Sequence, residues 1–74
     1  MEIKITYCSV WNYRPRAAGL ADLIKETLGV TPTLDPGSNG VYDIFANGQP
    51  LYSKDKTGEF PENQKILDLL KDLT

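Results

Sequence analysis

The chain has 74 residues, of which 41% are hydrophobic and 24% charged, and its eight basic and ten acidic side chains give a formal net charge of −2. This length makes one domain, residues 1–74, which buries roughly 60% of the surface of its unfolded chain. The lack of a positive excess argues against a nucleic-acid partner. No apolar run approaches the about 20 residues that span a bilayer, and no signal-peptide pattern opens the chain. We therefore expect a cytoplasmic protein without a membrane partner.

One cysteine and no histidine limit the chemistry further. A single cysteine cannot form an internal disulfide, and a zinc site normally needs several cysteine or histidine ligands. Disulfides are rare in a reducing compartment, which agrees with the cytoplasm. We expect no metal, no resident cofactor and a monomer.

The first half of the chain predicts a strand, a helix and a second strand. Residues 2–7 alternate, with Ile3, Ile5 and Tyr7 on one face, as in a strand with one buried face. Residues 15–28 carry an apolar stripe at helical spacing, and Pro15 and Gly29 suit its start and its end. Residues 30–35 predict a short strand that a proline assigns to a sheet edge.

The second half predicts a hairpin and a closing helix. Residues 41–46 form a strand, and Asn47-Gly48 is a two-residue hairpin signal that returns the chain into an edge strand over residues 49–54. A polar loop over residues 55–59 precedes a helix that Pro61 begins. The apolar stripe of this helix consists of Ile66, Leu69, Leu70 and Leu73.

The order β-α-β-β-β-α predicts a small α/β (α+β) domain, a four-stranded mixed sheet with two helices. The first helix connects two parallel strands, and such connections are right-handed. The carboxyl ends of parallel strands share one edge of the sheet. We therefore expect the turn over residues 36–40 to lie beside Cys8.

Cys8 lies where the first strand gives way to the first helix. The unpaired N–H groups and dipole of a helix N-terminus favour a thiolate, and Arg14 and Arg16 add positive charge. The alternative is a buried cysteine that acts as a small hydrophobic residue. The candidate binding residues around it are Ser9, Val10, Tyr13, Arg14 and Arg16. Tyr13 either lines the thiol site or packs on the sheet, and the arginines either hold carboxylates or are solvated surface residues.

The stretch Tyr7-Cys8-x-x-Trp11-x-Tyr13-Arg14-Pro15-Arg16 resembles the signature of the selenoprotein W/T/H (Rdx) family. That signature reads Tyr-Cys-x-x-(Sec or Cys)-x-Tyr-(Lys/Arg)-Pro-(Lys/Arg). The second half of the chain is similar to the family as well, through Gly40-Val41-Tyr42-Asp43-Ile44-Phe45, Asn47-Gly48 and Leu51-Tyr52-Ser53-Lys54.

This resemblance implies a thioredoxin-like fold and a cytoplasmic thiol-redox role, with glutathione or protein thiols as redox partners. Cys8 and Trp11 occupy the two catalytic positions of the family's Cys-x-x-Sec site. Pro36 is a candidate counterpart of the cis-proline near thioredoxin thiols, although a trans bond fits its turn equally well.

Trp11 departs from the family pattern, and three interpretations stay open. In the first interpretation, the natural residue is selenocysteine. Its codon, UGA, differs by one base from the tryptophan codon UGG and is misread as tryptophan. Alternatively, a natural tryptophan leaves a monothiol protein that forms a mixed disulfide with glutathione. In the third interpretation the redox function is lost, and the domain is a non-enzymatic protein-binding module.

Overall fold

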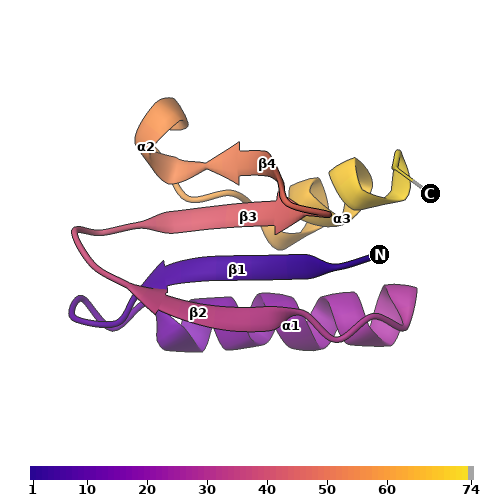
Figure 1. The fold of residues 1–74 in the computed structure, drawn as a ribbon, viewed down its shortest axis with the longest axis horizontal. Coiled ribbons are helices and arrows are strands. Elements are labelled where there is room, and N and C mark those ends of the chain that lie inside the picture. The colour runs from indigo at the N-terminus through magenta and orange to yellow at the C-terminus, as the bar shows by residue number, and fades with distance from the viewer. Residues whose placement is uncertain (74) are drawn as a thin grey trace.

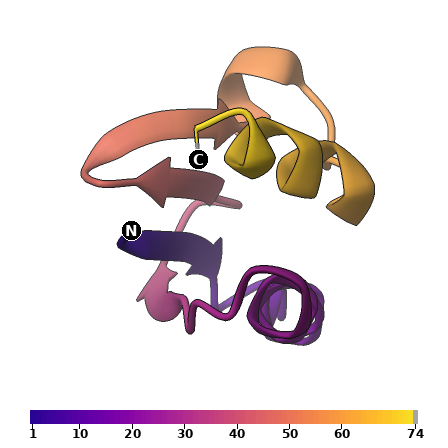
Figure 2. The same cartoon turned by 90° about the vertical axis from the view of Figure 1, so that its right-hand side faces the viewer.

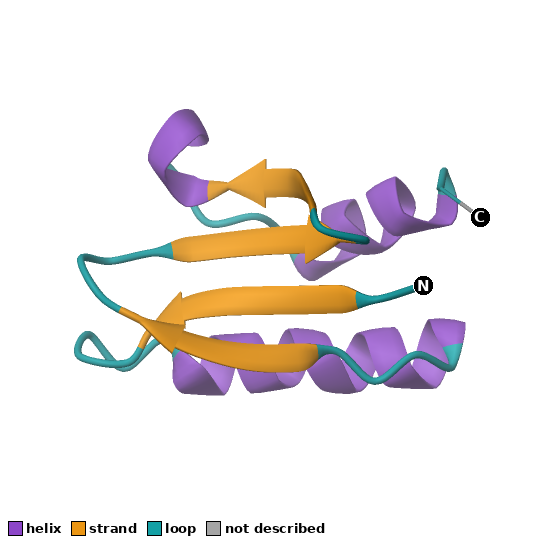
Figure 3. Cartoon of the chain, viewed as in Figure 1, coloured by secondary structure: helices purple, strands orange, loops and turns teal. Residues whose placement is uncertain are grey.

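The computed structural model describes residues 1–73, which form one sheet and three helices (Figures 1 and 3). The strands are β1 (Ile3–Cys8), β2 (Thr33–Gly37), β3 (Tyr42–Ala46) and β4 (Gln49–Ser53). The helices are α1 (Arg14–Leu28), α2 (Lys54–Thr57) and α3 (Asn63–Lys71). The predicted α+β class and mixed sheet are confirmed, and α2 is an additional short helix where the sequence predicted the end of a strand and a loop.

The sheet has the order β2-β1-β3-β4. The strand β1 is central in this half of the sheet, because it pairs in parallel with β2 and antiparallel with β3. Both β2 and β4 are edge strands, as the prolines predicted. The register places Cys8 opposite Gly37, so the end of β2 lies beside the cysteine as expected.

Both long helices cover the same face of the sheet, as the end-on view in Figure 2 shows. Ile5 and Tyr7 of β1 point to this face and pack against Leu20 of α1 and Leu70 of α3 in one core cluster. Within residues 1–73, neither long helix lies on the opposite face.

Several predicted bounds differ from the structure. The helix α3 begins at Asn63 rather than at Pro61, which lies before its N-cap, Glu62. The helix α3 ends at Lys71, so Leu73 lies beyond it and is 54% exposed, whereas Leu67 is buried in the core. The strand β2 begins at Thr33 rather than at residue 30. The strand begins there because the pairing with β1 starts at Thr33, opposite Lys4.

The predicted hairpin turn also ties the amino end of β1 to the sheet. Asn47 and Gly48 both have positive φ, 54° and 80°, as a two-residue hairpin of the common twisted type requires. The Asn47 N–H donates to the Glu2 carbonyl at 2.7 Å, and the Glu2 N–H donates to Asn47 Oδ1 at 2.9 Å. Asn47 therefore serves both the turn and the β1–β3 ladder.

We predict that Asn47→Ala destabilises the fold more than Asn39→Ala. Both residues have left-handed backbone, with φ of 54° and 60°, so alanine at either position costs about 1 kcal/mol in the free energy of unfolding. Only Asn47 also loses a side-chain hydrogen bond, worth about 1 kcal/mol more. Urea unfolding of the two variants measures the difference, and equal losses would show that the contact with Glu2 contributes nothing.

Candidate thiol site

The junction between β1 and α1 is fixed by backbone hydrogen bonds to both neighbouring strands. The Cys8 N–H donates to the Val41 carbonyl at 2.8 Å, and the Ser9 N–H donates to the Gly37 carbonyl at 3.2 Å. Ser9 Oγ also donates to that carbonyl at 3.3 Å. The loop of residues 9–13 and the β2–β3 turn therefore lie together at one end of the sheet, as Figure 1 shows.

The loop itself closes over a few short contacts. The Asn12 N–H donates to the Ser9 carbonyl at 3.2 Å, with a left-handed φ of 58° at Asn12. The Tyr13 N–H donates to the Cys8 carbonyl at 3.0 Å, and Tyr13 caps α1 without a side-chain hydrogen bond. This local path turns the chain from the strand into the helix within five residues, 9–13.

The Cys8 side chain is 0% exposed, so its thiol is closed off from solvent, although the loop that follows Cys8 leads directly into α1. Cys8 follows Tyr7, which faces the helices, and successive side chains of a strand point to opposite faces. The thiol accordingly lies outside the main core cluster. Its Sγ accepts the Trp11 N–H at 3.3 Å, and this is the polar contact that the loop offers to the sulfur. The burial of Cys8 agrees with the expectation of a cysteine that acts as a small hydrophobic residue. Its position at the junction between β1 and α1 agrees with the expectation of a functional thiol.

The tip of the loop is apolar and open to solvent. Val10 is 77% exposed and Trp11 59% exposed. The Trp11 ring lies directly on Gly40, because a Cβ built at Gly40 would stand 2.5 Å from the ring atom Cζ3. The glycine of the β2–β3 turn therefore leaves space for the side chain at position 11.

The two arginines of the motif bind aromatic side chains rather than the sulfur. Arg14 Nη1 donates to the Tyr7 hydroxyl at 3.1 Å, and the Arg16 guanidinium lies 4.0 Å from the centre of the Phe60 ring. Tyr7 belongs to the face that α1 and α3 cover, opposite to the Cys8 side chain. The expected direct support of a thiolate by Arg14 and Arg16 is therefore not what these contacts provide.

Phe60 and Lys54, which lie outside the Cys8 motif, complete this surface. Phe60 packs edge-on against Tyr13 and Tyr42, with centroids 4.8 and 5.3 Å apart, and Lys54 Nζ lies 5.3 Å from the Phe60 centroid. Tyr13 is thus half-buried against Phe60. Lys54 belongs to the Leu51-Tyr52-Ser53-Lys54 segment that resembles the family. No local sequence pattern could connect Lys54 with Arg16, because the two meet only at the Phe60 ring in the folded chain.

Tyr42 is 1% exposed, and its hydroxyl finds no hydrogen-bond partner among residues 1–73. Burial raises the pKa of Tyr42 to about 12, and the nearby Arg16 charge opposes that rise only in part. An unpartnered buried hydroxyl of this kind lowers stability rather than adding to it.

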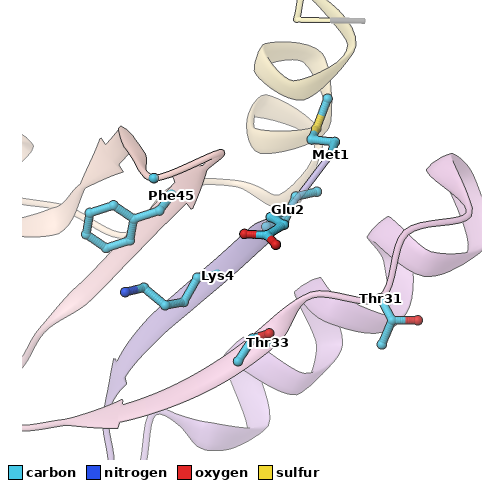
Figure 4. Close-up of a pocket in the computed structure, with 8 residues that line it drawn as sticks. Met1, Glu2, Lys4, Thr31, Thr33 and Phe45 are labelled. Carbon is cyan, nitrogen blue, oxygen red and sulfur yellow. The ribbon is translucent and has the colours of Figure 1, made fainter.

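Two cavities lie away from the thiol. One of about 440 Å³ opens at the far end of β1, where Lys4, Thr33 and Phe45 project from neighbouring strands (Figure 4). Another of about 230 Å³ lies between Tyr52, Phe60 and Lys65. Neither is lined by Cys8 or Trp11. The Asp35–Pro36 bond is trans, like every peptide bond in residues 1–73, so Pro36 is not a cis-proline counterpart.

Two further properties concern residues 1–73, the part of the chain that the structure describes. No group of three or more cysteine, aspartate or glutamate side chains there is arranged to hold a metal ion. None of its helices combines the length and the apolar character that crossing a bilayer requires.

A mixed four-stranded sheet, with a cysteine at the end of a central strand that leads into a helix, defines a thioredoxin-like fold. Solved structures agree with this class. A protein from Bordetella parapertussis is 33% identical, with a TM-score of 0.93 over 99% of this chain and 96% of that one. A selenoprotein W-related protein from Vibrio cholerae is 29% identical, with a TM-score of 0.91 over 97% and 94%.

The chain belongs to the Rdx family, whose model matches residues 2–72. The comparison with curated protein sequences gave no match. The family resemblance is thus confirmed, and it covers nearly the whole chain rather than the Cys8 motif alone.

We predict that Gly40→Ala displaces the Trp11 ring, whereas Gly48→Ala does not. The two glycines have φ of 72° and 80°, so alanine costs about 1 kcal/mol of backbone strain at either site. Only a Cβ at Gly40 meets the indole, and a Cβ at Gly48 meets open space. Because the chain has one tryptophan, acrylamide quenching of its fluorescence reports the ring directly. Unchanged quenching in Gly40→Ala would contradict the contact.

We predict that Tyr42→Phe keeps or raises the free energy of unfolding at neutral pH, by up to about 1 kcal/mol, because it removes an unpartnered hydroxyl. Tyr52→Phe is the matched control and loses about 1 kcal/mol, since its hydroxyl accepts from Thr57 Oγ1 and donates to the Glu59 carbonyl.

The same variants test the raised pKa of Tyr42. The folded protein holds this proton up to about pH 12, whereas the unfolded chain releases it near 10.0. The ionisation of Tyr42 therefore leaves the free energy of unfolding unchanged below pH 10 and lowers it progressively between about pH 10 and 12. Denaturant unfolding across this range should show a shallower loss in Tyr42→Phe than in Tyr52→Phe. Parallel pH profiles would rule out the Tyr42 effect.

Proposed function

We propose that this chain is a thiol-redox protein in which Cys8 exchanges with glutathione or with protein disulfides, and in which position 11 supplies the second redox atom. The observation that carries the proposal is the 3.3 Å contact between the Trp11 N–H and Cys8 Sγ. A sulfur or selenium atom on the β-carbon of residue 11 would belong to the residue whose backbone already contacts the Cys8 sulfur. The same N–H can donate to a developing thiolate, and hydrogen bonds to a charged acceptor are the stronger ones.

We propose selenocysteine as the natural residue at position 11. An indole that is 59% exposed is an unusual use of tryptophan, which normally buries its ring. Selenocysteine is encoded by UGA, and a single base change gives the tryptophan codon UGG. Sequencing the native gene is decisive, because UGG at this codon would exclude the proposal.

The exchange reaction has two balanced forms. With a second thiol or selenol at position 11, oxidised glutathione accepts two electrons, an intramolecular bond to Cys8 forms, and two molecules of reduced glutathione leave. With Trp11, the Cys8 sulfur attacks one sulfur of oxidised glutathione and forms a mixed disulfide. One molecule of reduced glutathione then leaves with the thiol proton. The protein needs no resident cofactor for either form, and we place it as a monomer in the reducing cytoplasm.

Access to the sulfur requires movement of the loop. Because Cys8 is fully buried, a disulfide can reach Sγ only after residues 10–12 swing away from it. The loop tip is held by one hydrogen bond each at Asn12 and Trp11 and by the packing of the Trp11 ring on Gly40. Cys8 itself is anchored in the sheet. The opening therefore concerns the loop tip and leaves the strand in place.

We predict that Trp11→Cys forms an intramolecular disulfide with Cys8 when the protein is incubated with oxidised glutathione. Intact-mass spectrometry should show the loss of two hydrogens without a lasting glutathione adduct. Trp11→Ser is the matched control, because it removes the indole without adding a thiol, and it should gain one glutathione on Cys8. A Trp11→Cys protein that stays a dithiol, or that carries only glutathione adducts, would refute the proposed role of position 11.

A non-enzymatic protein-binding module is the second candidate function. The observation that favours it is the combination of a sealed thiol with an exposed loop tip at Val10 and Trp11. The same incubation separates the two functions. If the unmodified chain and the Trp11→Ser protein both remain free of glutathione, binding is favoured over thiol exchange.

A further inference from the structure

Two cationic side chains from different helices converge on one aromatic ring beside the thiol loop. Arg16 of α1 lies 4.0 Å from the centre of Phe60, and Lys54 of α2 lies 5.3 Å from it. Lys54 also lies 5.8 Å from the centre of the Tyr13 ring. Attraction between a cation and the face of a ring holds both charges in place.

Neither of these cations is neutralised within residues 1–73. Arg16 and Lys54 contact aromatic rings there, and neither forms an ion pair or donates a hydrogen bond. Glu59 and Glu62 flank Phe60 in sequence but line the cavity beside Lys65. The first turn of α1 contains no acidic residue, so the positive end of the helix dipole is not offset there either.

This arrangement fits a carboxylate. A guanidinium that stacks on a ring uses its face and leaves the N–H groups of its edge free, and these can bind both oxygens of one carboxylate. The ammonium of Lys54 supplies three further donors. Arg16 and Lys54 are like charges close to one ring, and a bound anion reduces the repulsion between them.

The shape of the surface favours a polypeptide over a small molecule. Phe60 lines the cavity of about 230 Å³, but neither Arg16 nor Lys54 lines this cavity or the one of about 440 Å³. The neighbouring loop exposes Val10, and aromatic residues and arginine are enriched in protein interfaces. We propose that Arg16, Lys54 and Phe60 form a docking surface for an acidic segment of the protein whose disulfide or thiol exchanges with the site. The proposal rests on the thiol-exchange function for its purpose, but the binding itself involves no redox step.

The test is an NMR titration of the isotope-labelled full chain with a cysteine-free peptide of consecutive glutamates. Its counterpart with glutamines is the peptide control. The glutamate peptide should shift the signals around Arg16 and Lys54. Lys54→Gln and Arg16→Gln should each raise the dissociation constant about three- to fivefold, the range of a partly exposed ion pair. Lys56→Gln is the matched variant, because Lys56 is an exposed lysine of the same helix, and it should leave binding unchanged.

Each other outcome overturns the proposal. It fails if the glutamate peptide shifts nothing, if the glutamine peptide binds equally well, or if Lys56→Gln weakens binding as much as Lys54→Gln. Equal binding of free glutathione would assign the surface to a small anion instead. The peptide has no thiol, so its binding is independent of the redox function. If the peptide binds but Trp11→Cys forms no disulfide, the docking surface is supported and the redox function is refuted. If Trp11→Cys forms the disulfide but the peptide does not bind, the redox function is supported and the docking surface is refuted.

Discussion

The pairing of β1 on both sides is the constraint on which the site depends. At its end, Cys8 bonds to Val41 of the β3 side, and Ser9 bonds to Gly37 of the β2 side. Cys8 is buried, and leaving its backbone N–H unpaired would cost about 1–3 kcal/mol. The cysteine backbone is thus immobile on the scale at which the loop can move. Access to the buried sulfur therefore depends on residues 10–12 rather than on motion of the strand.

Much of the fold could be predicted because its signals are local. The alternation around Ile5, the glycine that ends α1 and the Asn47-Gly48 turn each specify backbone geometry within a few residues. Two errors have tertiary causes. The strand β2 starts only where its backbone reaches the register opposite Lys4, which composition does not reveal. The helix α2 has four residues, too few to show a helical period.

The site was predictable in place but not in detail. The motif located Cys8 at the junction and the 36–40 turn beside it, because parallel strands end at the same edge. Burial of the sulfur was not readable, since it depends on how residues 9–13 fold back over it. The direction of Arg16 was equally hidden. It is set by Phe60, which is distant in sequence and reaches α1 only through the connection between α2 and α3.

The result is a separation of charge from sulfur across the sheet. The arginines lie with Tyr7 and Phe60 on the helical side, whereas the Cys8 side chain points to the other face. Salt screens exposed charges beyond about 10 Å. Their attraction for an opposite charge is strongest where a binding partner excludes water from the contact. A partner that covers Phe60 and the loop tip would remove that water. The same contact that neutralises Arg16 and Lys54 would then bring the partner's own sulfur to the loop that must open.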